Sequence, residues 1–183
     1  KSKAIAERTM WDHLESLSHS DRIEAVAINP TLVVGPSLSD DMGTSNMFIQ
    51  RMIDGSYKAS PKIHFGFVTV EDTARAHIEA MLHPNASGKR FILSEKNMWL
   101  HEMNKVLVEN GYTKAPLKQL PDFLIKFLGL FNKELSVISG FVGRTKYTNS
   151  DNAKNILGFK FDGVDNAIVN TAKKFEELGI ITR

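Results

Sequence analysis

Two short, uninterrupted apolar runs place the strongest limit on the fold of this chain. Residues 25–28 read Ala-Val-Ala-Ile, with Asn29 and Pro30 directly after them, and residues 91–93 read Phe-Ile-Leu. Runs of this length without polar alternation are typical of strands buried on both faces, as in a parallel sheet. Helical patterns surround both runs, so the sequence predicts an α/β fold. Because two such strands are too few for a doubly wound sheet, we expect the missing strands to precede residue 1.

The remaining segments have mostly helical spacing. The pattern predicts helices over residues 1–18, 46–54, 71–82, 100–110, 121–128, 135–142, 148–157 and 165–178, and a strand over 65–70. One apolar face of the helix over 71–82 comprises Val70, Ala74, His77, Ile78 and Met81. The first helix begins at Lys1 without a capping residue. From that start we expect the chain to be the carboxyl-terminal portion of a longer protein.

The composition excludes several classes of function. The chain has 183 residues with 23 Lys and Arg against 21 Asp and Glu, and a formal charge of +2 is too weak for a dedicated nucleic-acid-binding protein. It has no cysteine, which excludes a disulfide scaffold and thiol catalysis and fits a reducing, cytoplasmic location. No apolar run approaches the roughly 20 residues of a membrane span, so we expect no membrane partner. The six histidines lack metal-ligand spacing, so we expect no metal site.

Five motifs in succession resemble the extended short-chain dehydrogenases/reductases. They are Lys-Ser-Lys-Ala-Ile-Ala-Glu-Arg-Thr-Met-Trp at 1–11, Asn-Pro-Thr-Leu-Val-Val-Gly-Pro at 29–36, Phe-Val-Thr-Val-Glu-Asp-Thr-Ala-Arg-Ala-His at 67–77, Arg-Phe-Ile-Leu-Ser at 90–94, and 146–159 with its Leu-Gly-Phe end. The second motif resembles the branch that contains dihydroflavonol reductases, cinnamoyl-CoA reductases and bacterial aldehyde reductases. The resemblance spans essentially the whole chain.

This resemblance implies a fold and a division into domains. The expected fold is the carboxyl-terminal part of an NAD(P)-binding, Rossmann-type doubly wound sheet, with a smaller, mainly helical substrate domain. Residues 1–38 and 65–97 would belong to the nucleotide-binding domain. Residues 39–64 and 98–183 would form mainly the substrate domain, with the last helices packing back. In the family, the helix at residues 1–18 also builds a homodimer interface.

The resemblance further implies an NAD(P)H-dependent reductase of aldehydes or ketones, with Lys3 as a catalytic and cofactor-binding residue. Lys3 stands where the family has a lysine four residues after its catalytic tyrosine, and that tyrosine would precede Lys1. Such a lysine lowers the pKa of the phenol and, in the family, binds the ribose of the cofactor. From the residues alone, an ordinary solvated lysine is the favoured interpretation of Lys3.

Further cofactor contacts are implied at Pro30, Thr31, Leu32, Val33 and Ser45. The first four leave the carboxyl end of a core strand, where open α/β sheets bind ligands. Without a ligand the same residues read as a strand end, and Ser45 reads as a helix cap. The implied cofactor is NADP or NAD, and the implied substrate is a small carbonyl compound.

Two other functions stay open from the sequence. One is a hydroxysteroid dehydrogenase or a sugar-nucleotide epimerase, and the other is a non-catalytic, dinucleotide-binding regulatory relative. The glycine-rich phosphate-binding loop of the family is absent from residues 1–183, and none of Tyr57, Tyr112 and Tyr147 has a lysine four residues later. We therefore expect the chain to be inactive alone.

Overall fold

Helices and strands alternate along the chain, as the apolar runs predict. The computed structural model describes residues 2–18, 20, 21, 23–38, 43–131, 136 and 138–182. Within them lie the helices α1 (Ser2–Ser16), α2 (Gly43–Ile53), α3 (Val70–Leu82), α4 (Leu100–Glu109), α5 (Asp122–Leu128), α7 (Asp151–Ile156) and α8 (Val164–Glu177). The strands are β1 (Ala27–Pro30), β2 (Leu32–Val34), β3 (His64–Thr69), β4 (Arg90–Leu93) and β5 (Lys96–Trp99). The helix predicted over 135–142 falls partly outside the described residues.

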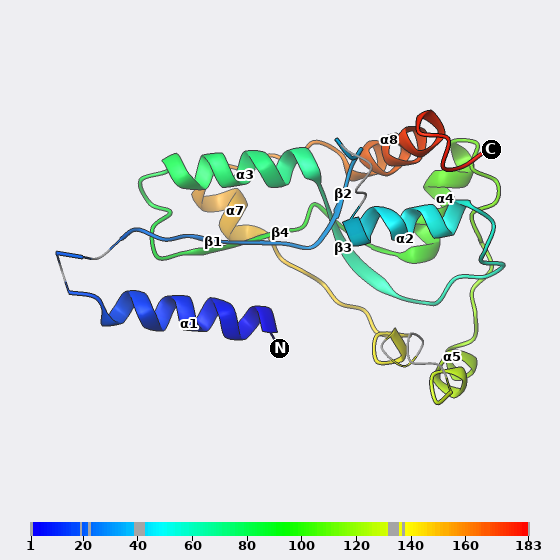
Figure 1. Cartoon of the computed structure of the whole chain (residues 1–183), viewed down its shortest axis with the longest axis horizontal. Helices are drawn as coiled ribbons and strands as arrows, with labels where there is room; N and C mark the ends of the chain where they lie inside the picture. The colour runs from blue at the N-terminus through cyan, green and yellow to red at the C-terminus, as the bar shows by residue number, and fades with distance from the viewer. Residues whose placement is uncertain are drawn as a thin grey trace.

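The strands form two small sheets (Figure 1), and β1 of one sheet continues almost directly into β2 of the other. β1 pairs in parallel with β4, from Ala27 opposite Arg90 to Pro30 opposite Leu93. β2 pairs in parallel with β3, and β5 adds an antiparallel strand to the other edge of β3. Thr31 alone separates β1 from β2, and its backbone N–H donates to the Leu93 carbonyl at 2.9 Å. Parallel pairs with helices around them confirm the α/β class.

The burial expected for the first apolar run is wrong. Residues 27–29 of β1 are only half-buried and Pro30 is exposed. In the described part of the chain, β1 pairs along one edge only, with β4. A strand at the edge of a sheet keeps more contact with solvent than a central strand does.

Two strands lie where no strand was predicted. β2 is a three-residue apolar segment directly after Thr31, and β5 reads Lys-Asn-Met-Trp, which is half polar. β5 becomes a strand because it pairs with β3, from His64 opposite Trp99 to Phe67 opposite Lys96. Strand pairing of this kind depends on a distant segment and overrides local propensity.

Two large hydrophobic cores stabilise the fold. One lies beneath α2, α4 and α8 against β2, β3 and β5, and includes Ile49, Phe67, Leu107, Ile168 and Phe175. The other lies beneath α3 and α7 against β4, and includes Ala76, Ala80, Phe91, Leu93 and Phe159. The two cores meet at β2, because Leu32 and Val34 belong with the first core and Val33, between them, packs against the second.

Helix α3 buries its small residues instead of its large apolar ones. Ala76 and Ala80 are buried, whereas Ile78 is 55% and Met81 74% exposed. Alanine has the smallest side chain that can pack on β1, β2 and β3, so it lets the helix axis approach these strands closely. The apolar face predicted from the sequence therefore points largely to solvent.

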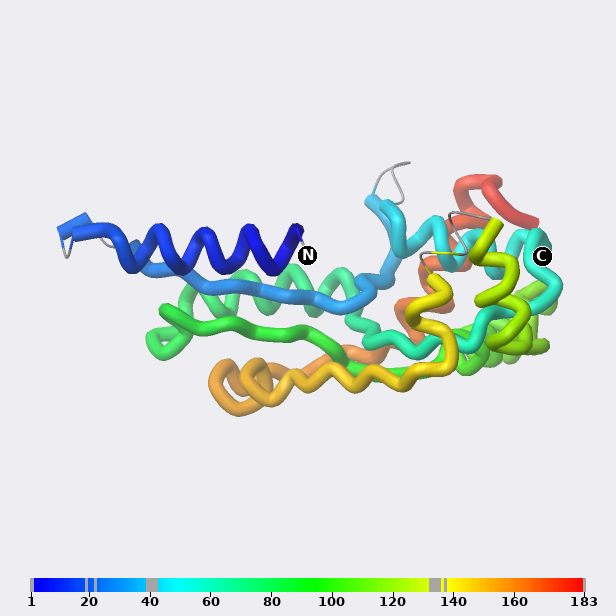
Figure 2. Tube along the Cα trace, turned by 90° about the horizontal axis from the view of Figure 1, so that it is seen from below, coloured from blue at the N-terminus to red at the C-terminus, as the bar shows by residue number. Residues whose placement is uncertain are grey.

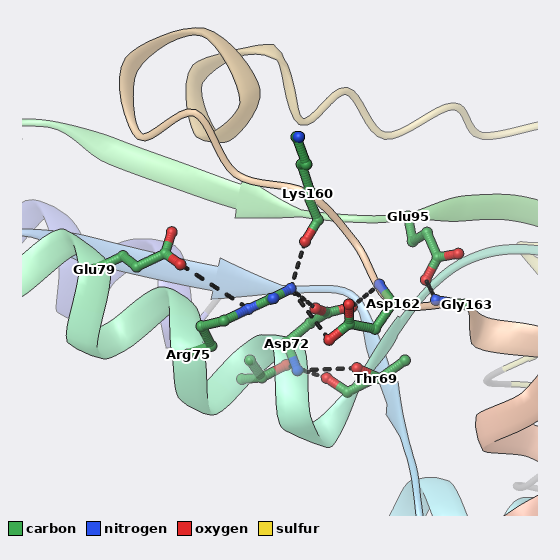
Figure 3. Close-up of polar contacts among 9 residues, drawn as sticks. Thr69, Asp72, Arg75, Glu79, Glu95, Lys160, Asp162 and Gly163 are labelled. Carbon is green, nitrogen blue, oxygen red and sulfur yellow. Dashed lines mark hydrogen bonds and ion pairs between the residues drawn. The ribbon is translucent and has the colours of Figure 1, made fainter.

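A buried carboxylate ties the start of α3 to the segment before α8 (Figure 3). Asp72 is fully buried, accepts from Arg75 at 2.5 Å and accepts from the backbone N–H of Asp162 at 3.0 Å. Arg75 also pairs with Asp162 at 3.3 Å and donates to the Lys160 carbonyl. The Thr69 hydroxyl caps α3 by accepting from the Asp72 N–H at 2.9 Å. These bonds satisfy Asp72 in the core and fix the amino-terminal end of α3.

Candidate functional site

A close backbone approach shapes the carboxyl end of β2. Gly35 follows β2, and a Cβ atom at this position would lie 2.4 Å from Cγ1 of Val70. Only glycine fits such a distance without displacing its neighbour. The first turn of α3 therefore packs directly on the end of β2.

Asn46 fixes the first turns of α2 against the same point. Its side-chain Nδ2 donates to the Gly35 carbonyl at 2.9 Å, and the residue is only 8% exposed. Its Oδ1 atom is buried and has no hydrogen-bond partner. A buried amide oxygen without a partner costs about 1–3 kcal/mol, so such atoms call for an explanation.

A cleft of about 630 Å³ lies between these three elements. Its walls come from the end of β2, the turn after it, the start of α2 and the start of α3, and they comprise Val33, Val34, Gly35, Pro36, Ser37, Leu38, Gly43, Thr44, Ser45, Asn46, Val70, Glu71 and Ala74. The lining is largely apolar, with a few polar side chains among valines. This is the usual composition of a site for a small organic ligand.

The predicted cofactor residues separate into two groups. Val33 and Ser45 both line the cleft, although twelve positions separate them in the chain. Thr31 has its hydroxyl bonded to the Leu93 carbonyl at 2.9 Å, and Leu32 packs against the first core. Pro30 ends β1 and is exposed. The structure thus brings two of the five residues into one cavity.

Lys3 lies on α1, and Glu7 of the same helix contacts the small parallel sheet. Glu7 accepts from Nε of Arg90 at 2.8 Å and from Nδ2 of Asn29 at 3.5 Å. The hydrogen bond from Arg90 holds the pKa of Glu7 below its usual value, although burial opposes this effect. Lys3 is exposed and lies one helical turn before Glu7, so the two share a helix face. That face points toward the end of β1, and α1 runs beside β1 in both overall views (Figures 1 and 2).

Asn46 and Glu71 are site residues that the sequence analysis did not identify. Asn46 shares one helical face with Ile49 and Ile53, and all three are buried. A polar residue within an apolar stripe is the signal that could have indicated Asn46. Glu71 lies in the first turn of α3, where an acidic side chain also interacts favourably with the helix dipole.

In the part of the chain that the structure describes, no group of three or more His, Asp or Glu side chains could hold a metal ion. None of the helices described there has the length and apolar character that a bilayer crossing requires.

Comparison with known proteins gives a consistent group of relatives, although no family model matches the chain. Cinnamoyl-CoA reductase CAD2 of Medicago truncatula is 36% identical over 121 residues, which are 66% of this chain and 34% of that protein. The NADPH-dependent methylglyoxal reductase GRE2 of Saccharomyces cerevisiae is 26% identical over 196 residues, covering 96% of this chain and 50% of that protein. The chain thus spans a third to a half of the length of these relatives.

The fold agrees with this grouping. A crystal structure of yeast methylglyoxal/isovaleraldehyde reductase Gre2 complexed with NADPH superposes with a TM-score of 0.70 at 22% identity, covering 96% of this chain and 54% of that chain. This likeness confirms the expected fold, a part of a Rossmann-type α/β structure with further helices. Over this shared part, the chain is therefore a homologue of the cinnamoyl-CoA reductase and Gre2 reductases.

Proposed function

We propose that the chain is part of an NAD(P)H-dependent reductase of aldehydes or ketones. The observation that carries this proposal is the cleft that joins Val33 and Ser45 at the carboxyl end of a parallel strand. Ligands of open α/β sheets bind at this end of the strands. The names of the relatives, a cinnamoyl-CoA reductase and an NADPH-dependent methylglyoxal reductase, support the same activity.

The cleft fits part of a nicotinamide cofactor. Val33, Val34 and Val70 provide an apolar wall for a flat ring, and the Ser45 hydroxyl lies in the first turn of α2. The unpartnered Oδ1 of Asn46 supplies a hydrogen-bond acceptor in the same wall. The cofactor is NADP, or NAD, and when bound it supplies the hydride for the carbonyl carbon. NADPH is the cofactor named for the relatives.

The backbone of residues 30–33 positions the cofactor in this proposal. The N–H and the hydroxyl of Thr31 both bond the Leu93 carbonyl, so Thr31 contributes shape and rigidity instead of a side-chain contact. Pro30 and Leu32 flank Thr31 and are held by the parallel pairings of β1 and β2. The backbone of residues 30–33 is therefore rigid before a ligand binds, which lowers the entropic cost of binding.

Lys3 binds the ribose of the cofactor and lowers the pKa of a tyrosine from the preceding part of the longer protein. The tyrosine then donates a proton to the oxygen that becomes the alcohol. The contact of Glu7 with Arg90 and Asn29 holds α1 in place, so Lys3 is presented from a fixed helix. A cation fixed near a phenol favours the charged phenolate, which is the physical basis of this role.

The predicted domain division also belongs to this proposal. Residues 1–38 and 65–97 form part of the nucleotide-binding domain, and residues 39–64 and 98–183 form mainly the substrate-binding domain. The cleft supports it, since Val33 and Glu71 come from the first part and Ser45 and Asn46 from the second.

We further propose a cytoplasmic homodimer that pairs through residues 1–18, because α1 buries none of its described residues and leaves Ile5 62% exposed.

The experiment that tests the proposal is carbonyl reduction by the longer protein, followed as NADPH oxidation with a panel of aldehydes and ketones. Lys3→Ala removes a charged hydrogen bond of about 1.5–3 kcal/mol, so kcat/KM is expected to fall roughly tenfold to a hundredfold. Lys3→Arg is expected to restore only part of this loss, because a planar guanidinium replaces a compact ammonium poorly.

Arg8→Ala is the matched control, since Arg8 is an exposed cation on another face of α1. Its kcat/KM is expected to equal that of the unchanged protein. The 183-residue chain alone is expected to show no turnover and no tight NADPH binding. Equal rates for Lys3→Ala and Arg8→Ala would disprove the role of Lys3, and no reduction of any carbonyl by the longer protein would disprove the function.

A further inference from the structure

The surface of α5 carries an unusual set of exposed apolar side chains. Phe123 is 73%, Phe127 57%, Leu130 76% and Phe131 79% exposed, all within nine positions. Contiguous large apolar side chains on a surface mark a site of interaction with another protein or with a membrane. We call this set, together with Leu128, the α5 surface.

The α5 surface belongs to an ordered part of the fold. Ile125 lies on the opposite side of α5, is 1% exposed and packs with Ile63 and Val142 in a small core. The rings of Phe127 and Phe131 pack edge to face with centroids 5.5 Å apart. Figure 1 shows α5 set apart from α4 and α8, at a corner of the molecule. The outer rings are therefore presented to solvent by a helix whose inner side is anchored.

Exposed basic residues lie on α5 and in the segments that flank it along the chain. Lys118, Lys126, Arg144 and Lys146 are exposed, and Nζ of Lys146 lies 4.2 Å from the ring centroid of Phe141. The sequence from 114 to 147 holds six Lys and Arg against two Asp and Glu, a surplus of four, whereas the whole chain carries only +2. The part of the sequence that contains α5 is thus more positive than the chain as a whole.

We propose that the α5 surface is a docking site for an anionic lipid membrane. Aromatic rings beside lysine and arginine are the combination that binds at the interface of a bilayer, where the rings enter the headgroup layer and the cations face anionic lipids. The expectation of no membrane partner rested on the lack of a spanning segment. That lack does not bear on binding at the membrane surface.

The charges argue against a second copy of the chain as the occupant. A symmetric dimer through this surface brings the same residues of both copies together. Both patches would carry the positive charges of Lys126, Arg144 and Lys146, and like charges across an interface are unfavourable. An anionic bilayer is complementary to the same residues.

The test is sedimentation of the 183-residue chain with lipid vesicles, either of phosphatidylcholine alone or of phosphatidylcholine with phosphatidylserine. The chain is expected to sediment with the anionic vesicles and to be released by high salt. Lys126→Glu reverses one basic charge, so partitioning is expected to weaken by roughly fivefold for each unit of charge lost. The double variant Phe127→Ser and Phe131→Ser is expected to lose vesicle binding.

Ile78→Ser and Met81→Ser provide the matched control, because they remove exposed apolar side chains from α3, outside the α5 surface. This control is expected to bind vesicles as the unchanged chain does, and circular dichroism checks that each variant is folded. Equal binding by the α5 variant and the α3 control overturns the proposal, as does equal binding to both kinds of vesicle. If the chain does not bind vesicles but forms a dimer in sedimentation velocity, and the Phe127→Ser and Phe131→Ser variant does not, the proposal is overturned in favour of a second copy. The proposal does not depend on the reductase function.

Discussion

Glu7 and Arg90 form an ion pair of 2.8 Å between α1 and β4, across 83 positions of the chain. Nε of Arg90 donates to one carboxylate oxygen and an NH2 group of Arg90 to the other. The pair fixes the helix that carries Lys3 against the parallel β1–β4 sheet. The position of the proposed catalytic lysine therefore depends on an interaction outside the cleft.

The Glu7–Arg90 pair predicts a pH-dependent contribution to stability. The hydrogen bond from Arg90 lowers the folded-state pKa of Glu7 below 4.5, so the stabilisation is present above pH 4.5 and is lost as the pH falls through the lower folded value. Glu7→Gln is expected to reduce the free energy of unfolding by about 0.5 kcal/mol near neutral pH and by nothing at low pH. Urea unfolding at several pH values measures the difference. A difference that grows toward acid pH would contradict this assignment.

The buried carboxylate of Asp72 is expected to be more important for stability. Asp72→Ala removes the acceptor of the Asp162 N–H and one of the acceptors of Arg75, so the free energy of unfolding should fall by about 2–3 kcal/mol. Thermal unfolding measures the change. Glu71→Ala, at the exposed neighbouring position, is the control and should alter the midpoint little. Equal effects of the two substitutions would show that the Asp72 network does not stabilise α3.

Gly35→Ala tests the close approach at the end of β2. The new methyl group would lie 2.4 Å from Cγ1 of Val70, which forces β2 and α3 apart and is expected to cost about 1–3 kcal/mol. Gly140→Ala is the control, because a Cβ there meets nothing within 4 Å. Denaturant unfolding of both variants gives the comparison. A stable Gly35→Ala chain would mean that α3 can move away from β2 at little cost.

Asn46 offers a test of hydrogen-bond polarity in the cleft wall. Asn46→Asp replaces the Nδ2 donor with an acceptor that faces the Gly35 carbonyl, whereas Asn46→Ala only deletes the bond. We expect Asn46→Ala to cost about 1 kcal/mol of stability and Asn46→Asp to cost more. Protonation of the new carboxyl restores a donor, so the Asn46→Asp chain should recover stability relative to Asn46→Ala as the pH falls. If Asn46→Asp is the more stable variant at neutral pH, Nδ2 is not the atom that contacts Gly35.

Much of the local structure could be predicted because it depends on neighbouring residues. The helical spacing of residues 100–110 and 165–178 corresponds to α4 and α8, and Gly111 and Gly179 follow these helices with φ values of 94° and 68°. The strand over 65–70 corresponds to β3 within one residue. Periodicity and the freedom of glycine act over a few positions, so the sequence alone determines them.

The tertiary structure decided which faces are buried and which residues meet. Local spacing could not show that α3 buries Asp72 and Ala76 while exposing Met81, because this depends on how closely β1–β3 approach the helix and on Asp162, 90 positions away. Nor could it show that Val33 and Ser45 share a cleft, or that β5 pairs with β3. The sequence determined the order of the elements and the motifs that indicate the family. The cleft exists only because Gly35, Asn46 and Val70 meet in the folded chain, and contacts between distant segments leave no periodic signal in the sequence.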